Sequence, residues 1–163
     1  AVKPLTLRPI EIIENDRDNK VYNANSLDLV PDIDVDILYV DPPYNGRQYL
    51  PNYHLLETIA KYDAPSIHGV TGMRDYESKK SSFCNAKTAL QGIDYIASSA
   101  KYKYLVLSYN SEGIMGKADI MSTLSKYGTV KLEEFEYLRF KSNNNGLAKT
   151  QKHVFEQLYI LKK

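Results

Sequence analysis

Apolar residues in this chain form short continuous runs that alternate with helix-like stripes. The segments "DILYV" (36–40) and "KYLVLSYN" (103–110) are nearly continuous apolar runs, which are typical of buried parallel strands. The segment "KVYNA" (20–24) predicts a further short strand, and "NSLDLV" (25–30) predicts a brief turn of helix after it. The pattern therefore begins as strand, helical turn and strand.

Three segments carry apolar residues at helical spacing: "LPNYHLLETIAKY" (50–62), "NAKTALQGIDYIASSA" (85–100) and "MGKADIMSTLSKYG" (115–128). Pro51 stands near the start of the first segment, and Gly128 is predicted to close the last. The apolar stripe of the first consists of Leu55, Leu56, Ile59 and Ala60. That of the second consists of Ala86, Ala89, Leu90, Ile93, Ile96 and Ala97.

Two further segments complete the pattern. Residues 62–84 carry a proline, two glycines and many polar residues, which predicts a long loop of the kind that is usually functional or mobile. Near the end, "TVKLEEFEYLRF" (129–140) and "HVFEQLYILKK" (153–163) flank a run of asparagines and Gly146. That turn chemistry predicts an antiparallel hairpin.

Alternating strands and helices with a terminal hairpin predict an α/β protein with an open sheet, formed by residues 1–163 as one domain. In such sheets, ligands bind beyond the carboxyl ends of the strands. Two polar turns that carry aromatic rings, residues 41–44 and residues 108–110, follow the two central strands. We therefore expect them to form one site.

Composition narrows the class of protein without identifying it. The chain has 163 residues, of which 43% are hydrophobic and 25% are charged. Its net charge is +1, so the overall charge does not indicate nucleic-acid binding. The 14 tyrosines outnumber 4 phenylalanines, and there is no tryptophan. Many of these rings either lie at a rim or binding face, or simply replace phenylalanine in the core.

Cys84 is the only cysteine, which excludes an intrachain disulfide and a multi-cysteine metal site and fits the reducing cytoplasm. The three histidines are dispersed, and we predict no metal site. No segment approaches the length of a membrane span, and no signal peptide opens the chain. The first residue is Ala rather than Met, which suggests a processed or truncated chain.

The turn of residues 41–44, Asp-Pro-Pro-Tyr, holds the most specific signal. Two prolines fix the backbone and donate no hydrogen bonds, so the carbonyls of Asp41 and Pro42 are held outside the sheet ladder. Tyr44 adds a flat ring at the end of the strand. Such a turn suits a site that accepts two hydrogen bonds while a ring stacks on the donor, although a turn of this kind can also merely end a strand.

The segments "LYVDPPYNGRQYLPNYHLLETIA" and "LVLSYNSEGIM" resemble the Dam-like class of adenine-N6 DNA methyltransferases, in particular the FokI-methylase type. The resemblance covers most of the chain from about Val21 onward. It implies a Rossmann-like, S-adenosylmethionine-dependent methyltransferase sheet with a C-terminal antiparallel hairpin. It also implies double-stranded DNA as the partner and a role in restriction–modification.

The resemblance further implies roles for the turn. The Asp41 carboxylate and the Pro42 carbonyl would accept hydrogen bonds from the two N–H groups of the adenine amino group. Pro43 would keep the turn rigid, and Tyr44 would stack on the flipped base. Neither a metal nor a covalent intermediate is needed. An amino-group methyltransferase of RNA, and a non-catalytic subunit or binding module with the same fold, are the alternatives.

Other site residues are implied less directly. Asn25 and Ser26, together with Asp41, match the cofactor-binding positions, although the family often has an acid where Asn25 stands and Asn25 also suits a helix N-cap. The predicted contacts with the target DNA are made by Tyr44, Asn45, Arg47, Tyr49, Phe140 and Lys141. Arg47 also reads as an exposed surface residue, and Phe140 also reads as a core residue. Three basic residues of the long loop, Arg74, Lys79 and Lys80, suit either a DNA backbone or a solvated loop tip.

One family motif is absent from the sequence. The eight glycines include no Gly-x-Gly pair, whereas the family binds the methionine part of its cofactor with a Phe-x-Gly-x-Gly turn. We therefore expect the chain to be the C-terminal, catalytic-motif part of a longer enzyme, which lacks the N-terminal cofactor loop and the region that reads the DNA sequence. A partner chain is a further possible source of that part. A sheet cut at that edge is expected to self-associate or to need its partner.

Overall fold

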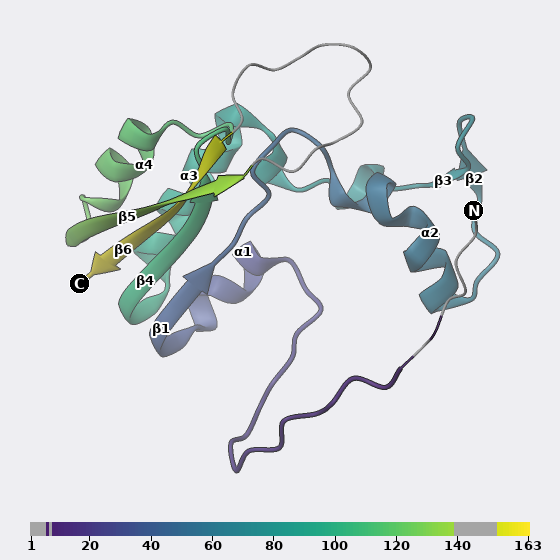
Figure 1. Ribbon diagram of the computed structural model, residues 1–163, viewed down its shortest axis with the longest axis horizontal. Coiled ribbons are helices and arrows are strands. Elements are labelled where there is room, and N and C mark those ends of the chain that lie inside the picture. Colours follow the sequence, from purple (N-terminus) through teal and green to yellow (C-terminus); the bar gives the residue numbers. More distant parts are fainter. Residues whose placement is uncertain (1–5, 7, 139–152) are drawn as a thin grey trace.

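The computed structural model describes residue 6, residues 8–138 and residues 153–163 (Figure 1). Its centre is a four-stranded sheet in the order β1-β4-β6-β5. The strands are β1 (Asp34–Val40), β4 (Lys101–Asn110), β5 (Thr129–Leu138) and β6 (His153–Lys162). Strand β1 is parallel to β4, and β6 is antiparallel to both β4 and β5. The predicted α/β class and the terminal antiparallel pair are confirmed.

Helices cover one face of the sheet (Figure 1). They are α1 (Ser26–Leu29) with the short 3-10 turn Val30–Asp32, α3 (Ala86–Ser99) and α4 (Lys117–Leu124). The predicted stripe of α3 is largely confirmed, since Ala89, Ile93, Ile96 and Ala97 are buried. They pack with Leu105, Leu107, Tyr109, Ile120, Leu124, Tyr159 and Leu161 in a single core.

The other face of the sheet carries exposed apolar side chains. Ile37 lies opposite Tyr104 in the register, and Tyr39 lies opposite Val106. The side chains of Ile37 and Tyr39 are 63% and 60% exposed. The prediction that residues 36–40 are a fully buried strand is therefore wrong for this face. Only the alternate residues, such as Leu38, point toward the helices and pack on the core.

The predicted strand at residues 20–24 is also wrong, since these residues have no strand conformation. A strand needs a neighbour for its backbone hydrogen bonds, and β1 pairs only with β4 among the described residues. Val21 is 94% exposed as a result. The helical turn that was predicted after it is confirmed as α1.

The segment after β1 forms an arm that stands apart from the sheet (Figure 1). It contains α2 (Tyr49–Lys61), the hairpin of β2 (Ile67–His68) and β3 (Met73–Arg74), and the 3-10 turn η2 (Glu77–Lys79). The chain then returns to the core through a second 3-10 turn, η3 (Ser82–Cys84), whose Phe83 belongs to the core. The predicted helix is confirmed, and the predicted long loop contains this small hairpin. However, Leu55, Leu56 and Ile59 are at least 60% exposed, so the predicted packing of this stripe is not seen.

The C-terminal end of α4 differs from its prediction. The helix ends at Leu124, four residues before the glycine that was expected to close it. Gly128 instead lies just before β5, where a Cβ atom would overlap the Lys162 carbonyl of β6. The glycine is needed there because the two backbones come so close.

Candidate functional site

The turn of residues 41–44 and residues 108–110 meet at the carboxyl edge of the sheet, as predicted, but residues 108–110 are the end of strand β4 rather than a turn, and the turn after β4 follows at residues 111–115. Strand β1 ends at Val40 and runs into Asp41 and the prolines, and the parallel neighbour β4 ends at Asn110. The ring of Tyr44 packs edge-on against that of Tyr109, with 5.2 Å between centroids and 72° between planes. The Tyr44 hydroxyl lies 3.4 Å from the Ser108 hydroxyl.

Tyr44 is also tied to the acid of its own turn. Its hydroxyl donates a hydrogen bond of 2.7 Å to Oδ1 of Asp41, whose side chain is exposed. Burial of the phenol raises the pKa of Tyr44 well above its usual range, and the hydrogen bond to Asp41 adds to the rise, while Ser108 lowers it. The phenol is therefore a hydrogen-bond donor over the whole physiological pH range.

Among the described residues, hydrogen bonds to the backbone of the turn reach the Tyr44 carbonyl. The Tyr44 carbonyl accepts hydrogen bonds from the Ile114 N–H at 2.9 Å and from the Tyr109 hydroxyl at 3.3 Å. No described residue donates to the carbonyl of Pro42. The turn thus combines a fixed backbone with the exposed Asp41 carboxylate and the carbonyl of the buried Pro42.

Two hollows are lined by residues of this turn. The first, of about 280 Å³, is mainly apolar and is lined by Ser26, Val30, Leu38, Tyr39, Val40, Asp41, Pro42, Pro43, Ser81, Phe83 and Ile96. The second, of about 580 Å³, is polar and more open, and is lined by Tyr44, Asn45, Gly46, Arg47, Asn110 and Glu112. Asp41 and the prolines face the apolar hollow, while Tyr44 borders the polar one.

The predicted cofactor residues flank the apolar hollow. Asn25 is the N-cap of α1, since its Oδ1 accepts a hydrogen bond of 3.2 Å from the Leu27 N–H. The alternative reading of Asn25 as a helix cap is therefore confirmed. Ser26 and Asp41 line the apolar hollow together. Contacts of these three residues with a cofactor stay predictions.

The predicted substrate residues are only partly brought together. Asn45 accepts a hydrogen bond of 2.9 Å from the Arg47 N–H, and both residues line the polar hollow. Tyr49 lies outside both hollows and stacks on Tyr53 with 5.8 Å between ring centroids. Phe140 and Lys141 lie outside the described residues.

Asn110 and Glu112 were not predicted as site residues, although residues 108–110 were expected at this edge. The Asn110 side-chain nitrogen donates to Oε1 of Glu156 at 2.9 Å, and its Oδ1 accepts from the Glu112 N–H at 2.9 Å. These two bonds fix the amide at the rim of the polar hollow. The only sequence signal was the position of an asparagine directly at the end of an apolar strand.

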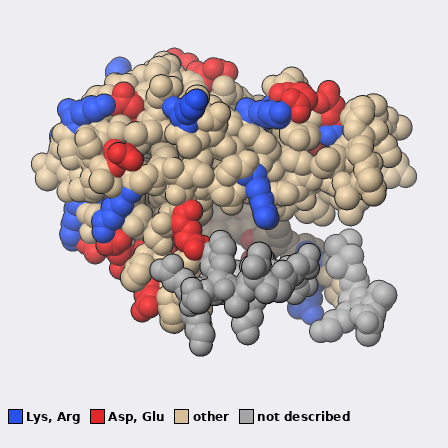
Figure 2. Space-filling view, turned by 90° about the horizontal axis from the view of Figure 1, so that it is seen from above, with Lys and Arg blue, Asp and Glu red and all other residues tan. Residues whose placement is uncertain are grey.

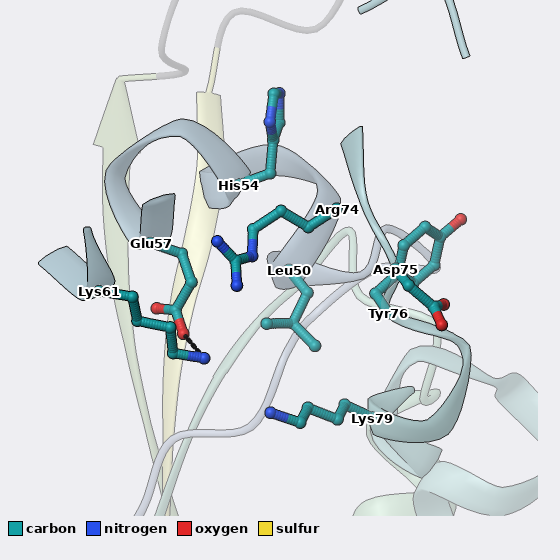
Figure 3. A pocket seen from close by; sticks show the side chains of 8 residues that line it. All are labelled: Leu50, His54, Glu57, Lys61, Arg74, Asp75, Tyr76 and Lys79. Atoms are coloured by element: carbon teal, nitrogen blue, oxygen red, sulfur yellow. Dashed lines mark ion pairs between the residues drawn. The ribbon is translucent and has the colours of Figure 1, made fainter. Parts of the chain in front are cut away.

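A separate pocket of about 70 Å³ lies in the arm, between α2 and η2 (Figure 3). Its lining is Leu50, His54, Glu57, Lys61, Arg74, Asp75, Tyr76 and Lys79. Most of the charge here is already paired, since Lys61 bonds Glu57, Arg74 bonds Asp63, and the nearby Lys80 bonds Glu77. Basic and acidic side chains are also interspersed on the face in Figure 2. A DNA-backbone role for Arg74, Lys79 and Lys80 stays a prediction.

Two other findings concern the described part of the chain as a whole. No helix within it is long and apolar enough to cross a membrane. Its His, Cys, Asp and Glu side chains form no group of three that is suited to hold a metal ion.

Comparison with known proteins gives consistent results. The chain is 38% identical to the type II methyltransferase M.FokI of Planomicrobium okeanokoites and 38% identical to the type II methyltransferase M.NlaIII of Neisseria lactamica. Both matches cover 100% of this chain, but it spans only 25% of M.FokI and 48% of M.NlaIII. The modification methylase StsI of Streptococcus sanguinis is 31% identical, and the chain spans 25% of it.

No solved structure gives a significant match. The family described as D12 class N6 adenine-specific DNA methyltransferase matches residues 2–123, which include α1, the turn of residues 41–44 and β4. The match thus covers both strand ends that form the site. The chain belongs to the D12 class of N6 adenine-specific DNA methyltransferases.

Proposed function

We propose that these residues form the methyl-transfer site of a site-specific DNA methyltransferase that acts on the N6 amino group of adenine in double-stranded DNA. Besides the family, one observation carries the proposal: a rigid turn holds Asp41 and Pro42 in the lining of one hollow, and Tyr44 of the same turn lines the other. Methyl transfer needs this kind of arrangement, because the methyl donor and its acceptor must be held close together and in line.

The turn supplies the acceptors that this reaction requires. The adenine amino nitrogen is a poor nucleophile because its lone pair is delocalised into the ring. The Asp41 carboxylate and the Pro42 carbonyl each accept a hydrogen bond from one of its N–H groups, which stabilises the positive charge that develops on nitrogen. The lone pair forms the new N–C bond while the C–S bond breaks and its electrons go to sulfur. The surplus proton then leaves nitrogen for the Asp41 carboxylate and passes to solvent, to which Asp41 is exposed.

The apolar hollow is suited to the cofactor side of the reaction. S-adenosylmethionine supplies an electrophilic methyl group on a positively charged sulfur. Pro43 and Phe83 offer apolar surface for a flat adenine ring, and Ser26 offers a hydroxyl at the edge of the hollow. Asn25 precedes Ser26, and its amide nitrogen is suited to an adenine edge. The Asp41 carboxylate gives this hollow a negative group near a cationic donor.

The polar hollow is suited to the target base, which must leave the duplex to reach the turn. The Tyr44 ring borders this hollow and stacks on the base, Asn45 shapes its floor, and Arg47 contacts a neighbouring phosphate. Tyr49 lies further along the arm and contacts the flanking DNA. Phe140 and Lys141 remain proposed contacts from the family resemblance alone.

We further propose that the sheet is one part of a larger Rossmann-like domain. The glycine loop for the cofactor and the DNA-reading region would then belong to another segment of the enzyme or to a partner chain. Two observations support this: the exposed apolar side chains of β1, such as Ile37 and Tyr39, and the greater length of the relatives. Self-association through the same surface is the alternative.

The test uses the complete enzyme that contains this chain, with radiolabelled S-adenosylmethionine and either duplex DNA or RNA. We expect N6-methyladenine in DNA only. Asp41→Ala and Asp41→Asn are expected to lower kcat by at least about 100-fold, as loss of a preorganised charge-stabilising group does. Asp36→Ala is the matched control, because Asp36 is an exposed acid of β1, the strand that leads into the turn, and its carboxylate pairs with Lys103.

Each outcome has a distinct meaning. Methylation of RNA alone would replace DNA as the substrate. An Asp41→Ala enzyme that methylates DNA at the wild-type rate would show that the turn is not the reaction site. Absence of methyl transfer with intact DNA binding in the wild type would favour a non-catalytic binding module.

A further inference from the structure

Tyr109 is a buried tyrosine that borders neither hollow, yet its hydroxyl joins the two turns of the site. We propose that Tyr109 is a positioning residue that sets the placement of the turn of residues 41–44 relative to β4. The proposal rests on the methyl-transfer function proposed above. It assigns a role to a residue that touches neither the cofactor nor the base.

The Tyr109 hydroxyl has two partners on different segments. It donates to the Tyr44 carbonyl at 3.3 Å, and it accepts a hydrogen bond of 3.1 Å from the buried Met115 N–H. The neighbouring Ile114 N–H donates to the same Tyr44 carbonyl at 2.9 Å. One phenol oxygen and one carbonyl oxygen therefore connect the turn after β1 with the turn after β4.

The packing around the ring reinforces this connection. The Tyr109 side chain is fully buried, and its ring meets the Tyr44 ring edge-on. Gly113 passes so close that a Cβ atom there would overlap the Tyr109 ring. The segment of residues 110–115 is thus wrapped directly around Tyr109, and its position depends on that ring and hydroxyl.

The connection reaches the reacting groups through a short and stiff path. The bound Tyr44 carbonyl lies two residues after the Pro42 carbonyl, and the intervening Pro43 restricts the backbone between them. A shift of the Tyr44 carbonyl is therefore passed on to Pro42. It also moves the Tyr44 phenol, which orients the Asp41 carboxylate.

Removal of the Tyr109 hydroxyl would leave a buried donor without a partner. The Met115 N–H loses its acceptor. A buried N–H without an acceptor has a free-energy cost, and this cost favours a shift of the segment that brings the N–H to water. The Ile114 N–H moves with that segment, so both hydrogen bonds to the Tyr44 carbonyl weaken together. The fold keeps its core, because phenylalanine fills the same space.

The test compares Tyr109→Phe with Tyr102→Phe in the complete enzyme. Tyr102 is a buried tyrosine at the other end of β4 whose hydroxyl donates to the Ala97 carbonyl at 2.7 Å, so it controls for loss of a buried phenol. We expect Tyr109→Phe to lower kcat about 10- to 100-fold, as misplacement of reacting groups does. KM for DNA and for S-adenosylmethionine should stay unchanged. Tyr102→Phe should keep the wild-type kcat even where its thermal stability falls.

Amide hydrogen exchange of Ile114 and Met115 is measured on the same variants and does not depend on catalysis. Faster exchange in Tyr109→Phe together with the selective loss of kcat supports the proposal. A wild-type kcat in Tyr109→Phe overturns it, as does an equal loss of kcat in Tyr102→Phe. If the wild-type enzyme methylates no adenine, the proposed function is overturned rather than the positioning role. In that case, unchanged exchange at both amides in Tyr109→Phe overturns the positioning role separately.

Discussion

The Tyr44 hydroxyl donates a hydrogen bond of 2.7 Å to Oδ1 of Asp41, so the ring and the acid of one turn are tied together. This bond holds one carboxylate oxygen in place and leaves Oδ2 for an incoming N–H group. The turn is therefore oriented before a ligand arrives, which is how preorganised sites avoid the cost of rearrangement during the reaction.

Tyr44→Phe tests how much this orientation of Asp41 contributes to kcat. The variant keeps the ring for stacking but loses a hydrogen bond worth about 1 kcal/mol, so we expect kcat to fall about fivefold. Tyr44→Ala removes the ring as well and should cost far more. Rapid-quench measurement of methyl transfer to duplex DNA gives both rates. Equal losses in the two variants would show that the ring itself contributes nothing.

A glycine in the second turn should resist substitution. A Cβ at position 113 would overlap the Tyr109 ring, and overpacking of this kind costs about 1–3 kcal/mol. Gly113→Ala should therefore lower the free energy of unfolding by that amount in urea titration. Gly46→Ala is the control, because its Cβ would lie 3.5 Å from the nearest atom, in ordinary contact. A Gly113→Ala protein as stable as Gly46→Ala would contradict the packing described here.

The elements that the sequence predicts well are those whose partners are also within the described chain. The stripe of α3 and the run of β4 are buried against each other, so apolar periodicity and burial agree. The meeting of the turn of residues 41–44 with residues 108–110 at the end of β4 follows from a general property of parallel strands, whose carboxyl ends lie at one edge of the sheet. That inference needed only two correctly predicted strands.

The failures share a physical cause. Ile37 and Leu55 were expected on buried faces and Val21 in a strand, yet all three are at least 63% exposed. A pattern of apolar positions predicts which side is buried, but it does not say where the covering partner is. The bonds of Tyr109 are a different kind of failure, since hydrogen bonds between segments that are 65 residues apart leave no local pattern.

The Cys84 thiol is a chemical probe for the polar side of the site, because it is hydrogen-bonded to the backbone of Arg47 there. The thiol is buried, donates to the Arg47 carbonyl at 3.3 Å, and has its pKa raised by burial, all of which disfavour the reactive thiolate. We expect a thiol reagent to label it at least about 100-fold more slowly in the native protein than in urea, as a local opening free energy near 3 kcal/mol requires. Cys84 is the only cysteine of this chain, and mass spectrometry of the labelled peptide identifies its signal. Labelling at the unfolded rate would show that residues 45–48 open freely.

The arm offers a test that is independent of catalysis. Arg74 donates two hydrogen bonds to the Asp63 carboxylate, at 2.5 and 2.6 Å, and a third to the Thr58 hydroxyl at 3.2 Å. These bonds join the β2–β3 hairpin to α2 and to the residues just after it. The Arg74 guanidinium also holds the pKa of Asp63 below its ordinary value of 3.8.

Arg74→Lys should therefore release the hairpin, because an ammonium group cannot form the paired bonds of a guanidinium. Limited proteolysis at neutral pH should cleave residues 62–80 faster. Lys80→Ala breaks the local contacts with Glu77 and the Tyr76 ring and should not change the rate. The lowered pKa of Asp63 adds a pH dependence. The stabilising effect of the pair is fully present above pH 3.8 and is lost as the pH falls through the lowered value. In the wild type, we expect protection of the hairpin from proteolysis to stay constant from neutral pH down to about pH 5 and to be lost in stronger acid. Loss of protection near neutral pH would contradict the role of the Asp63–Arg74 pair.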